Sequence, residues 1–353
     1  MIAWFKKITI NIALFLFVSV LLLLLGEWIA GIMVKKGVGQ RQQIMGSVEN
    51  IVIPSENPKL QFVFRPYYRD TDGDTVTNHM GFHDYDWTQA QLDESQVILN
   101  IGDSITFGAF IKHMEDVYGK ILESELQADY PEERYLVFNA GIGGYNIWQE
   151  AEMMKQLSSF FKWQMVILGF CLNDSSPMMY VNNNIKGAVV NVAPKVKSPK
   201  DIFSRKFLDR SKLYVMAKES FKSLQRRYPN LFPASMMWHN VLVKGPAWED
   251  LKETLREMNQ SLSAQGIPLV VVIFPYAHQL KLDADKNLVQ KDLVQFCKNE
   301  SIYCLDLFQS FKNNKDQIKW DAEGVHPDEA GHRIAGEAIY QYLRSKKLIP
   351  IEN

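Results

Sequence analysis

The sequence has little of several features that mark other protein classes. Its 353 residues contain only three cysteines, too few for a fold held together by disulfides. The formal net charge is −1, so the chain lacks the positive charge that a general nucleic-acid partner would require. Repeats and low-complexity tracts are absent as well. The length predicts one or two globular domains, and 47% hydrophobic residues are ample for a sizeable core.

Sequence motifs for common cofactors are also missing. The Gly-Ile-Gly-Gly sequence at 141–144 lacks the third glycine of a dinucleotide fingerprint, and there is no Gly-Lys-Ser or Gly-Lys-Thr phosphate loop. No His-Glu-x-x-His zinc motif occurs. His79 and His83 are four residues apart, but Gly81 interrupts a helix there, and two histidines alone do not complete a metal site. We therefore expect neither a metal nor an organic cofactor.

The N-terminus carries a long apolar run. Residues 8–26 are 19 residues without a charge, preceded by Lys6 and Lys7. A run of this length spans the hydrocarbon core of a bilayer. A cleaved signal peptide has a shorter apolar region and a small-residue cleavage site, and no convincing Ala-x-Ala site follows here. The run therefore predicts an uncleaved transmembrane helix within residues 1–34. Lysines on both sides nearly balance, so the positive-inside count barely decides the orientation.

Strands and helices alternate regularly from residue 96 onward. Short apolar runs rich in Val, Ile and Leu predict buried parallel strands at 96–101, 135–139, 164–170, 268–274 and 302–306. Helices are predicted at 115–128, 146–158, 247–264, 285–299 and 327–346. Such alternation is typical of a doubly wound parallel sheet with helices on both faces. We predict a three-layer α/β/α domain over 95–349, preceded by an irregular leader over 35–94 that packs on it.

An insertion at about 176–245 interrupts this alternation. Between Lys195 and Arg227 there are 11 Lys or Arg against 3 Asp or Glu. A solvated face of a helix over 202–227 is the default interpretation of such a run. The alternative is a lid or a surface that contacts anionic lipid headgroups, which basic residues near a membrane favour.

The cysteines lie in predicted α/β elements. Cys297 ends a predicted helix and Cys304 lies in the next strand, so a bridge between them is conceivable, although buried free thiols are favoured. Cys171 has no histidine nearby in the sequence, so nothing indicates a nucleophile.

Polar residues with catalytic potential follow the predicted strands. Gly-Asp-Ser-Ile-Thr-Phe-Gly at 102–108 places Ser104 directly after the first strand, although outside a Gly-x-Ser-x-Gly elbow. Gly144 follows the second strand and Asn173 the third, whereas His326 stands in Gly-Val-His-Pro just before the last helix. Ligands of open α/β sheets bind at the carboxyl ends of the strands. Each residue alone fits a helix cap or a tight turn, but the ordered set favours a catalytic site.

This ordered set of Ser, Gly, Asn and His resembles the four sequence blocks of the SGNH (GDSL-type) hydrolase superfamily, and it spans roughly residues 96–346. The resemblance implies an SGNH/flavodoxin-like fold with Ser104 as nucleophile and His326 as its base. It also implies an oxyanion hole formed by the backbone N–H groups of Ser104 and Gly144 and the side-chain amide of Asn173. A weak serine hydroxyl requires such a base, and the developing negative charge requires such donors.

The acid that orients His326 departs from the family pattern. Family members carry aspartate three residues before the histidine, and this chain has Glu323 there, with Asp321 two residues earlier. Glutamate serves this role in some hydrolases, so Glu323 is the expected acid. Asp321 is the alternative, and a Ser-His dyad assisted by a backbone carbonyl is a third arrangement.

The resemblance predicts a membrane-anchored serine esterase that forms an acyl-serine intermediate on a lipid or cell-envelope glycan. The catalytic domain is expected outside the cytoplasm. One alternative is an O-acyltransferase that passes the acyl group to an envelope polysaccharide. Another is a non-catalytic envelope protein that keeps the fold, since fold alone does not fix function.

Overall fold

The computed structural model describes most of the chain. The described residues are 11, 14, 15, 17–19, 21–29, 51–69, 76–175, 179–182, 188–191, 245–281, 287–321 and 324–349. The chain divides into two compact units. The larger unit comprises residues 47–193 and 233–353, and the smaller comprises 1–46 and 194–232. All of the elements named below belong to the larger unit.

A five-stranded parallel sheet forms the centre of the larger unit, as the apolar runs predict. Its strands are β3 (Gln96–Gly102), β4 (Tyr135–Asn139), β5 (Met165–Phe170), β8 (Leu269–Ile273) and β9 (Tyr303–Asp306). The order across the sheet is β4-β3-β5-β8-β9, with every neighbouring pair parallel. The chain therefore first moves to one side of β3 and then to the other. This reversal between β3 and β5 creates the switch point at which open α/β sheets bind ligands.

The predicted long helices are confirmed, within a few residues at their ends. They are α5 (Tyr118–Asp129), α6 (Ile147–Ser158), α10 (Pro246–Ser263), α11 (Leu288–Asn299) and α13 (Glu329–Ser345). Local residues explain where several of them begin. Asn146 accepts a hydrogen bond from Gln149 N at 3.2 Å, Asp328 caps α13, and Pro246 opens α10.

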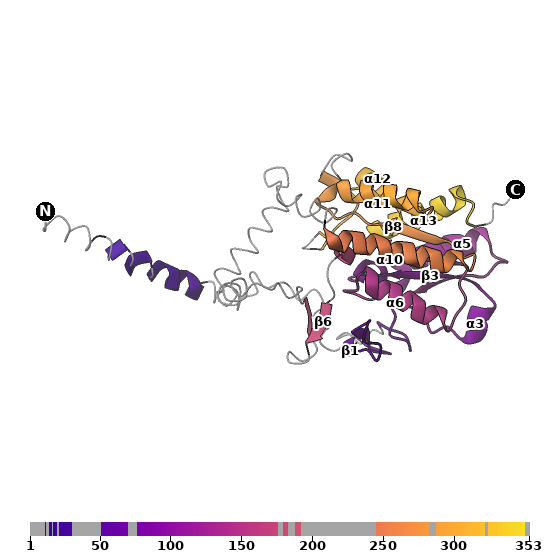
Figure 1. The fold of residues 1–353 in the computed structure, drawn as a ribbon, viewed down its shortest axis with the longest axis horizontal. Helices are drawn as coiled ribbons and strands as arrows, with labels where there is room; N and C mark the ends of the chain where they lie inside the picture. Colours follow the sequence, from indigo (N-terminus) through magenta and orange to yellow (C-terminus); the bar gives the residue numbers. More distant parts are fainter. Residues whose placement is uncertain are drawn as a thin grey trace. The chain divides into compact units, whose positions relative to one another are not determined.

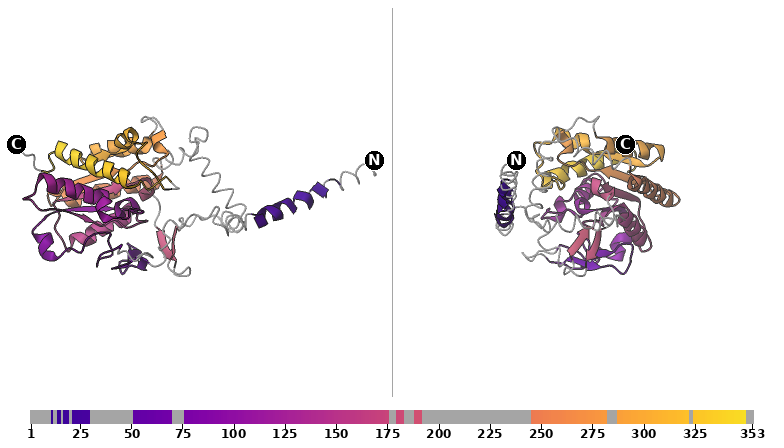
Figure 2. Two further views of the ribbon diagram at one scale, coloured as in Figure 1. Left: turned by 180° about the vertical axis from the view of Figure 1, so that it is seen from behind. Right: turned by 60° about the vertical axis from the view of Figure 1, so that its left-hand side comes forward.

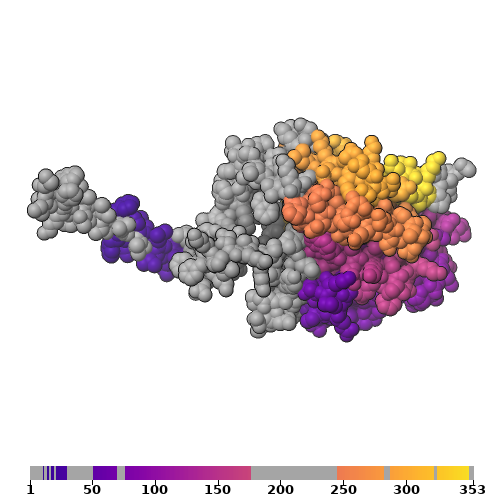
Figure 3. Space-filling model, viewed as in Figure 1, coloured from indigo at the N-terminus to yellow at the C-terminus, as the bar shows by residue number. Residues whose placement is uncertain are grey.

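Helices cover both faces of the sheet because strand side chains alternate between two cores. Leu99 and Leu168 pack with the apolar faces of α6, α10 and α11. Their neighbours Ile98 and Ile167 pack on the opposite face with α5, α13 and the short α12 (Phe308–Asn313). Figures 1 and 3 show α6 and α10 side by side on one face, and Figure 2 shows α5 and α13 on the other. The predicted three layers are present.

The sequence did not predict several short elements. These are the antiparallel pair β1 (Val52–Pro54) and β2 (Phe62–Phe64), the helices α3 (Gln89–Asp93) and α4 (Ser104–Phe107), and the 3₁₀ helices η1 (Met114–Asp116), η2 (Leu172–Ser175) and η3 (Gln279–Lys281). A further antiparallel pair, β6 (Met179–Asn182) and β7 (Ala188–Asn191), lies in the predicted insertion. Each is too short for hydrophobic periodicity to identify.

The described residues of the leader, 51–69 and 76–94, pack into the same core as the sheet. The ring of Phe64 contacts that of Phe107 at a centroid distance of 5.0 Å. Tyr145 OH donates to Phe62 O at 2.6 Å, and a ring nitrogen of the buried His83 lies 2.7 Å from Phe107 O. His79 instead contacts Asp86 at 2.7 Å, so the two histidines have different partners. The leader thereby supports the short helix α4.

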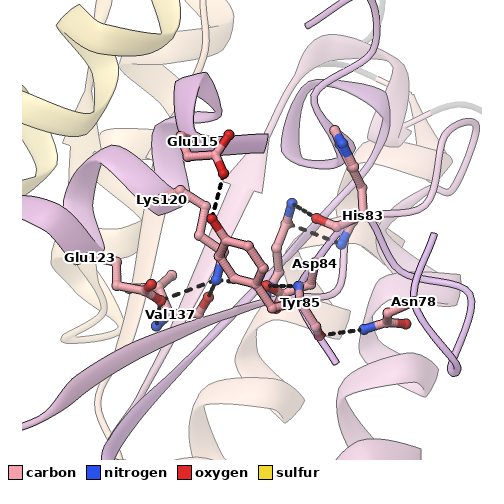
Figure 4. Close-up of polar contacts among 10 residues, drawn as sticks. Asn78, His83, Asp84, Tyr85, Glu115, Lys120, Glu123 and Val137 are labelled. Carbon is pink, nitrogen blue, oxygen red and sulfur yellow. Dashed lines mark hydrogen bonds and ion pairs between the residues drawn. The ribbon is translucent and has the colours of Figure 1, made fainter. Parts of the chain in front are cut away.

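Strand β4 is an edge of the sheet, and side chains cover its outward backbone groups (Figure 4). Lys120 donates to Val137 O at 2.7 Å, and Glu123 accepts from Val137 N at 2.7 Å. Asp84 of the leader accepts from Asn139 N at 2.7 Å. The Lys120 ammonium, itself buried, lies 2.6 Å from Asp84 and 3.1 Å from Glu123. Because an open edge strand invites pairing with another chain, this ion cluster closes the edge.

Other predictions fall partly or wholly outside the described residues. Residues 21–29 of the predicted membrane segment are helical, whereas the basic helix over 202–227 is not described. Among the described residues, no helix has the length and apolar character to cross a membrane. Cys297 and Cys304 are free thiols, so the bridge considered above is not formed. Burial of Cys297 agrees with the favoured interpretation.

Candidate active site

Ser104 lies at the carboxyl end of β3, where it is the first residue of α4. Asp103 caps this helix by accepting from Ile105 N at 2.9 Å. The turn is tight because the loop after β4 approaches α4 closely. A Cβ at Gly141 would lie 2.2 Å from Phe107 N, so only glycine fits there. Ser104 is thus held at the switch point with 8% of its surface exposed.

A continuous chain of contacts joins Ser104 to a histidine and a carboxylate. Ser104 Oγ lies 2.8 Å from His326 Nε2. On the other side of the imidazole, Nδ1 lies 2.7 Å from Asp321 Oδ2. These distances allow Nδ1–H to donate to the carboxylate, which leaves the Nε2 lone pair for the serine hydroxyl. The geometry is that of a nucleophile, a base and an orienting acid.

The loop before α13 brings Asp321 under His326. Asp321 N donates to His326 O at 3.0 Å, and Gly324 N donates to Asp321 O at 3.0 Å. Gly324 adopts a positive φ of 70°, which a glycine accepts without strain. The chain therefore doubles back, and a carboxylate five residues before the histidine reaches Nδ1. Glu323, the acid expected from the family spacing, lies outside the described residues.

The carboxylate of Asp321 is held in its charged form. Burial opposes this charge, but the hydrogen bonds from His326 and from Val325 N outweigh it and hold the pKa of Asp321 below its usual range. Val325 N donates to Asp321 Oδ1 at 2.8 Å, while Oδ2 contacts the imidazole. Asp321 therefore presents a fixed negative charge to the ring.

Asn173 is tied to the nucleophile through Asp103. Its Nδ2 donates to Asp103 Oδ2 at 2.7 Å, and the same oxygen lies 3.2 Å from Ser104 Oγ. Tyr276 OH donates to Asn173 Oδ1 at 2.7 Å, which fixes the orientation of the amide. One of the two N–H donors of the Asn173 side chain thus points to Asp103. The second N–H donor is not used in this contact.

Gly144 lies in the loop between β4 and α6, next to the end of β3. Ile142 N in the same loop donates to Gly102 O at 3.1 Å. Gly144 has a positive φ of 88°. The structure thus brings Ser104, His326, Asp321 and Asn173 into one network and places Gly144 in the adjoining loop.

A buried acidic cluster behind Ser104 was not predicted. Glu150 and Asp174 are both almost fully buried. Burial, with the nearby charge of Asp103, raises the pKa of Glu150 well above its usual range. Burial, and to a smaller extent the nearby charges of Glu150 and Asp103, also raise the pKa of Asp174 well above its usual range. Burial thus disfavours the charged forms of both groups. Glu150 gave no sequence signal because it lies in an amphipathic helix.

Part of this cluster has the donor types of a metal site. Asp103, Cys171 and Asp174 bring one ligand atom each to within 4.8 Å of one another. These atoms already have hydrogen-bond partners, however. Cys171 Sγ lies 3.0 Å from Asp103 Oδ2, and Cys171 N donates to Asp174 Oδ2 at 2.7 Å. Burial also raises the pKa of the Cys171 thiol, which disfavours the thiolate that a metal would bind.

Comparison with protein families identifies the chain. The sequence model described as the GDSL-like Lipase/Acylhydrolase family matches residues 101–334, which is more than half of the chain. The chain belongs to this family. The GDSL-type relationship inferred from the strand-end residues is therefore confirmed, and the protein is an ester-hydrolysing enzyme. A search of curated proteins finds no match.

Solved structures of several esterases are similar over most of the chain. A two-domain esterase active on acetylated mannans, co-crystallised with mannopentaose, has 14% identity and a TM-score of 0.43. That alignment covers 75% of this chain and 53% of the esterase, so this GDSL-type chain spans about half the length of that protein. A protein named TesA has 15% identity and a TM-score of 0.41, with 72% and 100% covered.

A catalytic mutant of Axe2, an acetylxylan esterase from Geobacillus stearothermophilus, has 16% identity and a TM-score of 0.42. Its alignment covers 70% of this chain and 93% of Axe2.

Proposed function

We propose that this GDSL-type enzyme hydrolyses a carboxylic ester through an acyl intermediate on Ser104. The observation that carries this proposal is the unbroken chain of short contacts from Ser104 Oγ through His326 to Asp321, at 2.8 and 2.7 Å. It also argues against a non-catalytic envelope protein, because a binding protein has no use for a preformed nucleophile–base pair.

The first half-reaction transfers the acyl group to the enzyme. His326 Nε2 takes the hydroxyl proton as Ser104 Oγ attacks the carbonyl carbon, which gives a tetrahedral intermediate with a negatively charged oxygen. The imidazolium then gives this proton to the alkoxy oxygen, the bond to the leaving group breaks, and the free alcohol departs. In the second half-reaction His326 takes a proton from water as the water oxygen attacks the acyl carbon. The imidazolium then returns this proton to Ser104 Oγ as the bond between Oγ and the acyl carbon breaks, which releases the acid.

The negative oxygen of the tetrahedral intermediate requires donors. We assign the backbone N–H groups of Ser104 and Gly144, by the family resemblance, and the amide of Asn173. The contact from Asn173 Nδ2 to Asp103 Oδ2 at 2.7 Å supports this assignment, because it holds the amide beside the nucleophile while one N–H remains for the substrate.

We propose Asp321, rather than Glu323, as the acid of the triad. Its carboxylate is within hydrogen-bond distance of His326 Nδ1 and is fixed by the backbone N–H of Val325. A carboxylate in this position orients the imidazole and stabilises the imidazolium that forms during attack. A dyad with a backbone carbonyl has no advantage here, since the charged group is already in contact with the ring.

We further propose that residues 8–34 anchor the enzyme in a membrane, with the catalytic unit outside the cytoplasm. The uncharged run of 19 residues supports this, as do the exposed leucines of the helical stretch 21–29. The substrate would then be a lipid or an acylated envelope glycan. Carbonate extraction of membranes tests the anchor: an integral protein stays in the pellet, and release into the supernatant would contradict it.

Turnover of a simple ester tests the hydrolase proposal. The wild-type enzyme should release acetic acid from ethyl acetate in a pH-stat, and Ser104→Ala should abolish this release. Ser159→Ala removes an exposed hydroxyl at the end of α6 and serves as the matched control with wild-type turnover. Retained hydrolysis by Ser104→Ala would overturn the mechanism. Product that forms only when a sugar acceptor is added would identify an acyltransferase instead.

A further inference from the structure

Phe110 presents an exposed aromatic ring next to His326. Its ring centroid lies 5.2 Å from that of His326 with an interplanar angle of 67°, an edge-to-face contact. Phe110 is 56% exposed, whereas its neighbours Ala109 and Ile111 are both buried. The loop after α4 therefore anchors itself in the core on either side of Phe110 and leaves this one ring at the surface beside the catalytic base.

The backbone at Phe110 adopts a conformation that phenylalanine does not favour. Its φ is +71°, in the left-handed region that glycine and asparagine prefer. Ile111 N donates to Gly108 O at 3.0 Å, which closes a turn with Phe110 as its third residue. Turns that need a positive φ at this position usually have Gly or Asn there. Neither core packing nor backbone preference thus accounts for a phenylalanine, and strained residues of this kind concentrate at ligand-binding sites.

The proposed mechanism defines which part of a substrate meets this ring. His326 Nε2 must reach the alkoxy oxygen of the ester in order to protonate it, so the leaving alcohol lies beside the imidazole. The carbonyl oxygen instead faces the donors around Asn173. Because Phe110 contacts the imidazole ring, it borders the space of the alcohol rather than that of the acyl group.

We propose that Phe110 is a specificity-determining residue for the alcohol and selects acylated pyranose sugars. This inference rests on the proposed function. One face of a pyranose ring carries mainly C–H groups, and covering the exposed phenyl ring with it removes apolar surface from water. The hydroxyl groups at the sugar's edges would meet the exposed side chains that follow, Lys112 and His113. A single ring with polar neighbours fits a sugar better than a lipid, which favours a larger continuous apolar patch.

Two esters of the same acid test this assignment. Values of kcat/KM are measured for a methyl mono-O-acetyl-pyranoside and for ethyl acetate with wild-type enzyme and Phe110→Gly. Glycine accepts the positive φ, so the variant should fold and its melting temperature should not fall. The ratio of sugar to ethyl ester kcat/KM should drop by roughly tenfold or more, the size expected for a hydrophobic contact, mainly through KM. Phe110→Trp should keep most of the wild-type ratio.

Phe160→Ala is the matched control, because Phe160 is another exposed aromatic residue, two positions after the end of α6, and its loss should leave the ratio unchanged. An equal fall for both esters in Phe110→Gly would overturn the inference and indicate that Phe110 only positions His326. A larger fall with octyl acetate than with the pyranoside would assign the subsite to a lipid alcohol instead. An unchanged ratio, with hydrolysis still lost in Ser104→Ala, would refute the role of Phe110 alone. Hydrolysis retained by Ser104→Ala, or absent from the wild-type enzyme, would refute the proposed function.

Discussion

Replacement of Asp321 by asparagine should cripple turnover while leaving the fold intact. Asparagine has nearly the same shape, and its Oδ1 can still accept the hydrogen bond that Val325 N donates at 2.8 Å. The substitution removes the negatively charged carboxylate, whose Oδ2 lies 2.7 Å from His326 Nδ1. Its NH₂ group would also turn the imidazole into the tautomer with a proton on Nε2, which cannot accept the proton of Ser104.

The size of the effect follows from the charge pair that is lost. Charge centres separated by about 4 Å, at the effective dielectric constant of about 20 that suits partly buried sites, attract by about 4 kcal/mol. Loss of this attraction to the imidazolium corresponds to a decrease of about 10³-fold in kcat. The side chain of Asp321 is 11% exposed, so solvent screens the pair only in part. We therefore expect a decrease between about 10² and 10⁴-fold, in line with the triad template.

Steady-state hydrolysis of ethyl acetate measures this effect, and thermal unfolding verifies that the variant is folded. Glu323→Gln is the matched control, because it removes a carboxylate two residues away, and we expect it to change kcat by less than about threefold. A loss of less than about tenfold in Asp321→Asn would refute the charge argument. A severe loss confined to Glu323→Gln would return the role to the residue that the family spacing indicates.

Three further predictions concern stability and catalysis. Lys120→Met leaves the buried carboxylate of Asp84 without its counter-charge, so the free energy of unfolding measured in urea should fall by about 3–5 kcal/mol. Lys59→Met, at an exposed ion pair, should lower it by less than about 1 kcal/mol. Similar decreases for the two variants would refute the role of the Lys120 cluster. Burial raises the pKa of Asp306 to about 6 in the folded protein. The contribution of Asp306 to the free energy of unfolding is therefore complete below about pH 4 and is lost as the pH rises through 6. Asp306→Asn should therefore raise stability at pH 8 by up to about 3 kcal/mol but not at pH 4, and equal effects at both pH values would contradict this. Asn173→Ala should lower kcat by about 100- to 1000-fold with little change in KM, and a kcat near that of the wild-type enzyme would remove it from the oxyanion hole.

The strands and long helices were predictable because burial leaves a direct pattern in the sequence. The run Leu269–Ile273 is apolar at every position, and Val97–Ile101 is apolar at every position except Asn100, as a strand covered on both faces requires. The positions of Ser104 and Asn173 at strand ends then followed from the alternation of strands and helices, because parallel strands all end at one edge of the sheet.

Contacts that depend on loop geometry or on distant residues were not predictable. The family spacing indicated Glu323 as the acid, because spacing does not show how a loop turns. The turn that folds Asp321 back onto His326 depends on Gly324 in a left-handed conformation and on hydrogen bonds between backbone groups of the loop. A lysine on an amphipathic helix predicts a solvated side chain. Lys120 is buried instead, because Asp84 of the leader, 36 residues earlier, supplies its counter-charge.

Mapping of the residue modified by a fluorophosphonate probe tests the central claim most directly. Such a probe forms a covalent bond only with a serine whose hydroxyl is activated by a base. Peptide mass spectrometry of the labelled wild-type protein should find a single adduct on Ser104. The adduct should be absent from Ser104→Ala and strongly reduced in His326→Ala. An adduct on another residue, or labelling of Ser104→Ala at the wild-type rate, would contradict the account.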